Sequence, residues 1–473
     1  MQVPVFHLMA KPSSFQCNIK CTYCFYLEKE ELFASQQITD LSVASNSLSC
    51  DSNQDDAINA VSTVTTDDTI TSATTVAPAT TVTNSVTNAD AIANANTVAN
   101  IASALHPHMS DQVLEVYIRK YIEQNPASRI DFTWQGGEPT LMGLNFFRKV
   151  VSLQQKHRGN KQIHNALQSN GIAFNRAWMQ FFKEHNFLIG LSIDGSAAIH
   201  DKYRISVNGK PTYGKVKRAI ELLQEYQVEF NTLTVVNDAN WQHGLETYLT
   251  LKNLGVKHMQ FIPCVEVANY QPYACGGREP SHSQEGLYQP PVDFKLAPFS
   301  VPAHGYGEFL IEVFDYWVKH DVGQIFIREF DNLTGQWLGY PSANCVYRPT
   351  CGTSLIVEAN GDLYACDHFV YAGYKLGNIA QPNLAQTVVA NAEKFGAAKQ
   401  QTLTSKCQQC QVLALCNGGC PKHRLVTLEG QTYKHNYLCP SYYAFFTHTM
   451  PVMNKLRVII QAGYPAAAIM QYV

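Results

Sequence analysis

The sequence predicts an α/β protein in which a partial (β/α)6 barrel of the TIM type precedes a cysteine-rich C-terminal domain. Strand-like and helix-like patterns alternate six times before residue 266, and such alternation is typical of a parallel sheet covered by helices. Six units are fewer than the eight of a closed TIM barrel, so we expect an open one. Eight cysteines then fall between residues 345 and 439, which indicates a separate domain.

The barrel elements follow from hydrophobic periodicity. The first strand is expected at residues 3–9, where Val3, Val5, His7 and Met9 alternate with their neighbours. Further strands are expected at 129–134, 163–168, 187–193, 229–236 and 258–263. A helix beginning at Ser110 and Asp111 precedes the second strand, and later helices are expected at 146–157, 176–185, 215–226 and 245–254. An amphipathic helix at 308–320 lies beyond the barrel.

Residues 37–105 interrupt this pattern. They are rich in Ser, Thr, Asn, Asp and Ala and contain no aromatic residue, so they cannot bury enough apolar surface to offset the entropy of ordering. We expect a disordered insertion that divides the barrel into 1–36 and 106–266. A linker at 267–344, the cysteine-rich domain at 345–440 and a terminal segment at 441–473 complete the predicted organisation.

Charge and hydropathy exclude several classes of function. A net charge of −3 argues against a nucleic-acid or membrane-surface partner, since either would favour a basic face. No apolar run approaches the roughly 18 residues of a membrane span, and no signal peptide is evident. We therefore expect a cytoplasmic protein, in which clustered cysteines indicate metal or redox chemistry rather than disulfides.

Three thiols near the N-terminus form the most distinctive motif. Cys17, Cys21 and Cys24 are spaced C-x3-C-x2-C, and clustered thiolates suit zinc or iron–sulfur groups. Three ligands leave one coordination position open, as catalytic metal sites do. The alternative is a structural zinc knuckle with a fourth ligand elsewhere, such as His7.

Polar motifs follow the ends of the predicted strands, where TIM-type barrels carry their chemistry. They comprise Gln135-Gly136-Gly137-Glu138-Pro139, Gln168-Ser169-Asn170-Gly171, Ser192-Ile193-Asp194-Gly195 and Pro263-Cys264-Val265-Glu266. The two glycines would let a ligand approach the backbone, Glu138 could bind an amine, and Arg204 could bind a carboxylate. Alone, Gly-Gly and Asp-Gly are usually turns, but their shared placement favours a site for a ligand with both groups.

The cysteine loop with Tyr23 before its last thiol, followed by Gly-Gly-Glu-Pro after the next strand, resembles the radical S-adenosylmethionine (SAM) superfamily. The resemblance implies that Cys17, Cys21 and Cys24 hold a [4Fe–4S] cluster whose open iron binds SAM. It also implies SAM contacts from these residues: Tyr23 and Gly137 along the nucleotide, Glu138 at the amino group, Ser192 and Arg204 at the ribose and carboxylate, and Val265 at the adenine. The protein would supply binding and orientation for chemistry that belongs to the cofactor.

The C-terminal cysteines allow two readings. Cys345, Cys351 and Cys366 precede a C-x2-C-x5-C-x3-C run formed by Cys407, Cys410, Cys416 and Cys420, and Cys439 comes last. Spacing alone permits two zinc ribbons. The pattern also resembles the SPASM domain, which carries auxiliary [4Fe–4S] clusters in peptide-modifying radical SAM enzymes. Cys50, Cys264 and Cys275 have no partners at metal-site spacing and are expected not to be ligands.

Within that superfamily the chain is similar to the anaerobic sulfatase-maturating enzymes. The similarity rests on the C-x5-C-x14-C spacing, on Asp367 directly after Cys366, and on Gln135 and Tyr26 beside the two barrel motifs. It implies that Asp367 is the catalytic base, and that Tyr26 and Gln135 bind substrate. It also implies interleaved ligation, with Cys345, Cys351, Cys366 and Cys420 on the first auxiliary cluster and Cys407, Cys410, Cys416 and Cys439 on the second. A partly dry site should raise the pKa of Asp367.

The implied substrate is a cysteine or serine in an unfolded sulfatase segment of the pattern Cys/Ser-x-Pro-x-Arg. A radical derived from SAM would remove a hydrogen atom from its β-carbon, Asp367 would take a proton, and an auxiliary cluster would accept an electron, leading to Cα-formylglycine. The implied cofactors are SAM and three [4Fe–4S] clusters, with flavodoxin or ferredoxin as electron donor. Two alternatives remain, namely a SPASM enzyme that forms thioether or carbon–carbon crosslinks, and a non-catalytic zinc scaffold.

Overall fold

The structure is a computed structural model that describes residues 3–26, 108–268 and 295–473. These residues belong to one compact unit, Met1–Glu30 with Pro107–Val473. The predicted disordered insertion, residues 269–294 of the predicted linker, and Cys50 and Cys275 lie outside the described residues.

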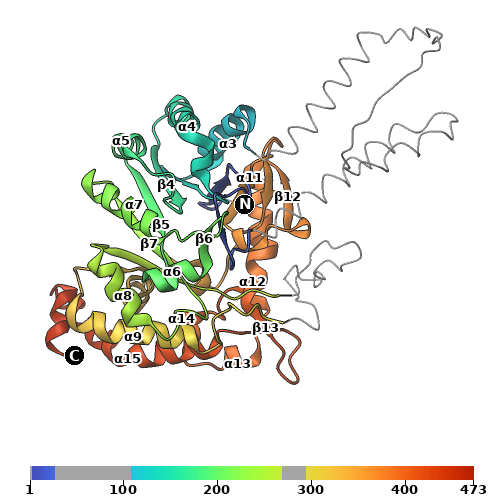
Figure 1. Cartoon of the computed structure of the whole chain (residues 1–473). Coiled ribbons are helices and arrows are strands. Elements are labelled where there is room, and N and C mark those ends of the chain that lie inside the picture. The colour runs from blue at the N-terminus through green and yellow to red at the C-terminus, as the bar shows by residue number, and fades with distance from the viewer. Residues whose placement is uncertain (1–2, 27–107, 269–294) are drawn as a thin grey trace, which may run out of the picture. The chain divides into compact units, whose positions relative to one another are not determined.

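A parallel sheet forms the core of the unit (Figure 1). Six strands lie in the order of their sequence and pair in parallel, as the predicted partial barrel requires. They are β1 (His7–Lys11), β3 (Arg129–Trp134), β4 (Gln162–Ser169), β5 (Phe187–Ser192), β7 (Phe230–Val236) and β8 (His258–Pro263). The mixed α/β class and the strand order confirm the predicted fold class.

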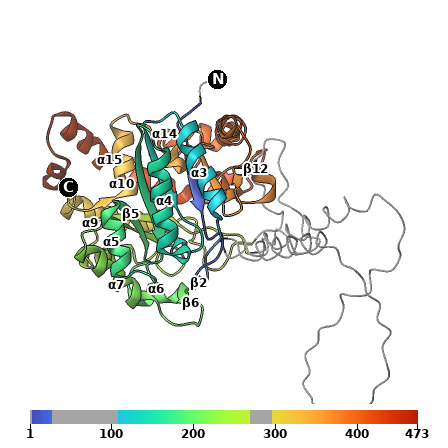
Figure 2. The same cartoon turned by 90° about the horizontal axis from the view of Figure 1, so that it is seen from above.

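Helices connect these strands and cover one face of the sheet, as Figures 1 and 2 show for α3, α4, α5 and α7. The connecting helices are α3 (Asp111–Gln124), α4 (Gly143–His157), α5 (Arg176–Glu184), α6 (Ala197–Tyr203), α7 (Tyr213–Glu225) and α8 (Gly244–Asn253). Two begin at side-chain caps, because Ser110 accepts from the Val113 amide and Asn175 accepts from the Ala177 amide. Each therefore starts where its cap satisfies a free backbone donor.

The first strand differs from its prediction. It runs from His7 to Lys11 rather than over 3–9, and its buried side chains are Leu8, Ala10 and Lys11, while Val5 is 64% exposed. The strand is held in place by a hydrogen bond of 2.8 Å from the Tyr117 hydroxyl to the Leu8 carbonyl. As a result, Lys11 stands at the carboxyl end of a central strand.

The C-terminal domain continues the barrel sheet. Strand β10 (Ser354–Glu358) pairs in parallel with β1, and β11 (Asp362–Tyr364) and β12 (Lys375–Asn378) add to it in antiparallel fashion. Lys11 is in register with Glu358. At the opposite edge β9 (Phe326–Ile327) pairs with β8. The sheet thus carries a segment of the cysteine-rich domain to the edge of the barrel.

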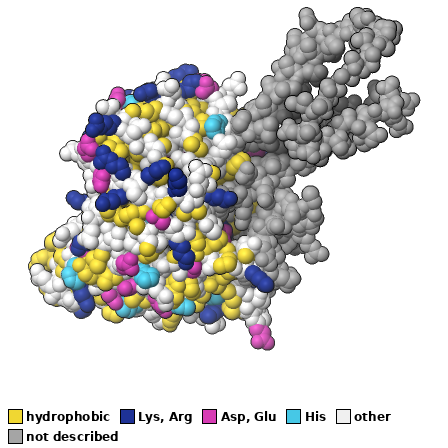
Figure 3. All heavy atoms as spheres, in the orientation of Figure 1, with side chains coloured by type: hydrophobic (Ala, Val, Ile, Leu, Met, Phe, Trp, Pro, Cys, Tyr) yellow, Lys and Arg dark blue, Asp and Glu magenta, His cyan; other side chains and the backbone are white. Residues whose placement is uncertain are grey.

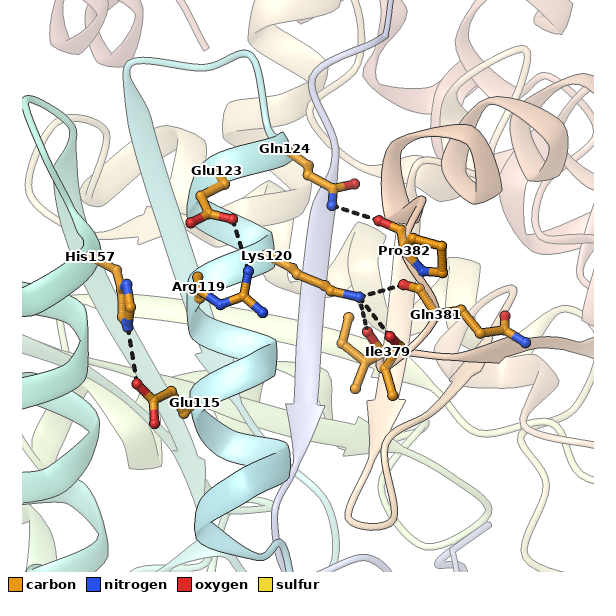
Figure 4. Close-up of polar contacts among 10 residues, drawn as sticks. Glu115, Arg119, Lys120, Glu123, Gln124, His157, Ile379, Gln381 and Pro382 are labelled. Atoms are coloured by element: carbon orange, nitrogen blue, oxygen red, sulfur yellow. Dashed lines mark hydrogen bonds and ion pairs between the residues drawn. The ribbon is translucent and has the colours of Figure 1, made fainter.

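Lys120 of α3 forms hydrogen bonds with this C-terminal segment (Figure 4). Its buried ammonium group donates to the carbonyls of Ile379 at 2.8 Å, Ala380 at 3.0 Å and Gln381. One turn later, Gln124 donates to the Pro382 carbonyl at 3.0 Å. Backbone groups of the loop after β12 are therefore satisfied by side chains of the barrel.

The remaining helices lie beyond the barrel strands. Helix α9 (Gly305–His320) contains the predicted amphipathic helix and packs along the long α15 (Cys439–Gln461) in Figure 1. The other elements are α10 (Arg328–Trp337), α11 (Leu384–Asn391), α12 (Ala397–Gln401), α13 (Ser405–Gln408), α14 (Leu413–Cys416), β2 (Ile19–Cys21), β6 (Arg204–Ser206), β13 (Arg424–Val426) and β14 (His435–Asn436).

Both signs of charge are scattered over the face drawn in Figure 3. Several surface cations are paired on the helices, as Lys149 is with Asp111 and Lys156 is with Glu115. Within the described ranges, no helix has the length and apolar character that crossing a bilayer would require.

Candidate active site

The three-cysteine loop lies over the carboxyl ends of the barrel strands. Its strand β2 pairs with β6 so that Cys21 faces Arg204, and the Cys24 amide closes a turn onto the Cys21 carbonyl at 3.0 Å. Ile19, Cys21 and Tyr23 form a small buried core with Cys264, which follows β8. Cys264 therefore packs beneath the loop.

The Gly-Gly-Glu-Pro motif holds this loop. The Gly137 amide donates to the Ser14 carbonyl at 2.6 Å, and the Glu138 amide donates to the Gln16 carbonyl at 2.8 Å. A Cβ at Gly137 would stand 2.0 Å from the Gln16 carbonyl oxygen, so no larger residue fits. We expected this space to admit a ligand, but the backbone of the cysteine loop occupies it. Glycine is needed here because two backbone segments approach each other closely.

Glu138 is buried and oriented by three neighbours. Its Oε1 accepts from the Thr140 amide, the Thr140 hydroxyl and the Ser169 hydroxyl, whereas its Oε2 accepts only from the Asn170 amide, at 2.8 Å. Burial raises the pKa of this carboxyl, and these hydrogen bonds oppose the rise. Because a carboxylate oxygen has two lone pairs, Oε2 retains capacity for an ammonium group.

Arg204 meets Tyr23 and Asp194 in a second buried cluster. Its Nη1 donates to the Tyr23 hydroxyl at 3.0 Å, and that hydroxyl donates to Asp194. The buried Arg204 Nε has no hydrogen-bond partner among the described residues. Since an unpaired buried donor costs free energy, this atom fits a carboxylate or hydroxyl of a bound molecule. Asp194 was part of a predicted motif but was not singled out as a site residue.

The other residues expected to contact SAM lie at the same edge of the sheet. Ser192 closes β5 and accepts from the Gln168 side chain at 3.0 Å, while the buried Val265 follows β8. With Glu138 and Arg204 they offer an anion, a cation, a hydroxyl and an apolar surface, and this donor set fits an amino acid joined to a nucleoside. The set therefore suits SAM.

Lys11 organises a third cluster, which the sequence did not predict. Its fully buried ammonium lies 2.6 Å from Asp367 Oδ1 and 3.2 Å from Gln135 Oε1. It also stands 4.6 Å from the centre of the Tyr26 ring. One buried cation thus brings together the predicted base and both predicted substrate-binding residues. A lysine near the end of an apolar strand was the available signal, but the strand was predicted to end at residue 9, before Lys11.

Glu358 completes this cluster by accepting from the Tyr26 hydroxyl at 2.6 Å. The side chain of Asp367 is 24% exposed, so a substrate can reach it. Burial acts to raise the pKa of Asp367, but the charge and hydrogen bond of Lys11 together with the fields of His368 and Lys422 outweigh it, and the pKa lies below its usual value. The expected rise of this pKa was wrong because Lys11, which counters the effect of burial, is distant from Asp367 in the sequence.

The C-terminal cysteines separate into two interleaved sets. Burial raises the pKa of Cys366, and the fields of Cys345, Cys420 and Cys351 add to the rise. In the second set burial raises the pKa of Cys416 to about 12, and the fields of Cys407, Cys439 and Cys410 act in the same direction. Such thiols would ionise only when bound to a metal group.

The described residues do not present a site for a single zinc ion. Zinc draws its thiolates to about 2.3 Å from one centre. Across the described part of the chain, no three His, Cys, Asp or Glu side chains converge in this way. His7, the fourth ligand of the zinc alternative, instead pairs with the Thr133 hydroxyl at 3.0 Å.

Comparison with known proteins agrees with this arrangement. The family described as the radical SAM superfamily matches residues 101–251, and the SPASM iron-sulfur cluster-binding domain matches residues 345–411. A serine-type anaerobic sulfatase-maturating enzyme of Bacteroides thetaiotaomicron is 38% identical over 366 residues, covering 77% of this chain and 86% of that protein. A cysteine-type enzyme of Clostridium perfringens is 29% identical over 452 residues, covering 95% and 97%.

A solved structure of native anSMEcpe with bound AdoMet and Cp18Cys peptide is also similar. It superposes with a TM-score of 0.69 at 28% identity and covers 97% of this chain and 100% of that chain. The similarity therefore extends over the barrel and the cysteine-rich domain together.

Proposed function

The chain belongs to the anaerobic sulfatase-maturating enzymes, and on this basis we propose how its residues oxidise a cysteine or serine of a sulfatase polypeptide to Cα-formylglycine. It is a radical SAM oxidoreductase whose cofactors are SAM and [4Fe–4S] clusters. Its substrate is a peptide segment. The assignment of individual residues is the proposal that follows.

Cys17, Cys21 and Cys24 hold the cluster that binds SAM. Cys345, Cys351, Cys366 and Cys420 hold the first auxiliary cluster, and Cys407, Cys410, Cys416 and Cys439 hold the second. This division is supported by the mutual fields of the buried thiols within each set. Four thiolates for each auxiliary cluster leave no open iron, which favours electron transfer over substrate ligation.

Around SAM, Glu138 Oε2 receives the amino group and Arg204 Nε receives the carboxylate or a ribose hydroxyl. The free lone pair of Glu138 and the unpaired donor of Arg204 support these roles. Tyr23 and Gly137 support the nucleotide site through the cysteine loop, Ser192 contributes a hydroxyl, and Val265 lies against the adenine.

When bound, SAM supplies the radical that removes a substrate hydrogen atom, and an auxiliary cluster accepts the remaining electron. Asp367 takes the proton from the substrate thiol or hydroxyl. It is suited to this role as an ionised carboxylate that is exposed on one side and held by Lys11 on the other. Gln135 and Tyr26 bind the substrate segment beside it.

We assign the substrate segment the pattern Cys/Ser-x-Pro-x-Arg and the electron donor to the flavodoxins or ferredoxins. The cytoplasm is the proposed compartment, which accords with the free thiols of all twelve cysteines in the described ranges.

The observation that carries this proposal is the ion pair of 2.6 Å between Lys11 and Asp367, which joins the predicted base to the predicted substrate residues. The test is an anaerobic assay of the reconstituted enzyme with SAM, a reductant and two peptides that differ only in Cys or Ser at the target position. Formylglycine detected by mass spectrometry in either peptide is the expected result. Formation of 5′-deoxyadenosine with both peptides unchanged would overturn the proposal.

A further inference from the structure

Two buried cations lie among the auxiliary cysteines. Lys399 is fully buried, and its ammonium donates to the carbonyls of Cys345 and Val346, each at 2.8 Å. Arg424 is also buried, and its Nη2 donates to the Lys399 carbonyl at 2.8 Å while its Nη1 donates to the Thr402 hydroxyl at 2.7 Å. The two side chains are thus fixed to one another and to the backbone beside the first ligand set.

Neither cation has a carboxylate partner. None of the ion pairs between described residues includes Lys399 or Arg424. A buried charge without a counter-ion is costly, so an anion must balance these two when the protein is loaded. Thiolates are the anionic groups whose fields reach them.

The two cations face different ligand sets. The thiols acting on Lys399 are Cys351, Cys420 and Cys345, which all belong to the first set. Those acting on Arg424 are Cys407 and Cys416 of the second set together with Cys420 and Cys351 of the first. Arg424 also lies beside the backbone between Cys416 of the second set and Cys420 of the first, since a Cβ added at Gly418 would stand 3.0 Å from its Nη2. Lys399 lies beside the first set alone.

We propose that Lys399 and Arg424 raise the reduction potentials of the auxiliary clusters, Lys399 that of the first and Arg424 those of both. Reduction adds one negative charge to a cluster in a dry, low-dielectric site, and a fixed neighbouring cation stabilises that charge. Both residues act on the clusters through their positive charge, and neither contacts the substrate.

This inference rests on the proposed function, in which the substrate loses a hydrogen atom, a proton and an electron to three different acceptors. The hydrogen atom leaves on 5′-deoxyadenosine, the proton goes to Asp367, and one electron reduces an auxiliary [4Fe–4S] cluster from the 2+ to the 1+ state. Because the acceptor must take that electron, a raised potential favours product formation.

The test is an EPR-monitored redox titration of the anaerobically reconstituted full chain, without peptide. Lys399→Met should lower one auxiliary midpoint, and Arg424→Gln should lower two. We expect at least a tenfold loss of electron affinity, which is about 59 mV for a one-electron couple. The charge-conserving Lys399→Arg should stay near the wild-type potential, and Lys394→Met should leave all midpoints unchanged, because Lys394 is exposed.

Iron and sulfide are counted in every variant, so that a lost cluster is not mistaken for a shifted one. Unchanged midpoints in cluster-replete Lys399→Met or Arg424→Gln would overturn the inference. An equal shift in Lys394→Met would do the same. The titration needs no substrate. Failure to form formylglycine would therefore reject the proposed function, but the midpoint potentials would still test the role of the two cations.

Discussion

Lys11 and Asp367 lie 356 positions apart in the sequence, yet their side chains form an ion pair of 2.6 Å. The contact exists because β10 extends the barrel sheet beside β1 and brings the start of the cysteine-rich domain to the carboxyl end of that strand. The proposed base is therefore positioned by a residue of the barrel, and both domains contribute residues to this cluster.

Replacing Lys11 with Met should uncouple the reaction. The variant removes the cation that orients Asp367 and Gln135, and misplacing a reacting group by about 1 Å can cost a hundredfold in rate. Formylglycine formation should fall by about that factor while SAM cleavage continues, as read from the ratio of formylglycine to 5′-deoxyadenosine. Lys20→Met removes an exposed lysine of the cysteine loop and should retain the wild-type ratio. A wild-type ratio in Lys11→Met would show that the ion pair is dispensable.

Gly137→Ala should selectively lose the SAM-binding cluster. The added Cβ would collide with the Gln16 carbonyl and displace the cysteine loop, whereas the auxiliary sets lie in another domain. We expect roughly a third less iron and no SAM cleavage, with auxiliary EPR signals retained. Gly214→Ala is the matched control, since a Cβ there meets no atom within 4 Å. Full iron content and SAM cleavage in Gly137→Ala would contradict the packing argument.

Most of the barrel strands could be predicted from the sequence because they depend on local periodicity. The cysteines that we propose as cluster ligands could be named because the signal lies in their spacing. Strand Arg129–Trp134, for example, was predicted with the bounds that it has. Sequence reasoning missed Lys11, Glu358, Lys399 and Arg424, because each acquires its role from a partner that is distant in the sequence. The predicted pKa of Asp367 was wrong for the same reason, since the burial of Asp367 could be anticipated but the neighbouring charge of Lys11 could not.

Lys120→Met should loosen the junction between α3 and the loop after β12. Three carbonyls lose their donor, and each buried group left unpaired costs about 1–3 kcal/mol. The free energy of unfolding should fall by at least about 2 kcal/mol in urea titrations. Arg119→Met removes only an exposed pair with Glu123 on the same helix and should change stability by less than about 0.5 kcal/mol. Equal stability of the Lys120→Met and Arg119→Met variants would show that the hydrogen bonds from Lys120 do not stabilise this junction.

Glu329 should make stability fall as pH rises. Burial raises its pKa to about 7, while the unfolded chain has the ordinary value near 4.5. The folded state therefore holds more protons between these values, so the free energy of unfolding decreases across this window by up to about 3 kcal/mol. Glu329→Gln, which can still accept from the Phe261 amide, should be more stable than wild type at pH 8 and similar at pH 5.

The measurement is the thermal midpoint of each protein between pH 5 and pH 8. Glu308→Gln changes an exposed carboxylate and should follow the wild-type curve. If the difference between Glu329→Gln and wild type were the same at both ends of the range, Glu329 would not be the titrating group.

The most direct test of the central claim compares wild type with Asp367→Asn in the peptide assay, under anaerobic conditions with SAM and reductant. The amide keeps the shape of the side chain but cannot accept the substrate proton. We predict full iron content and continued formation of 5′-deoxyadenosine, with formylglycine reduced at least a hundredfold. Formylglycine at the wild-type ratio to 5′-deoxyadenosine would show that Asp367 is not the base.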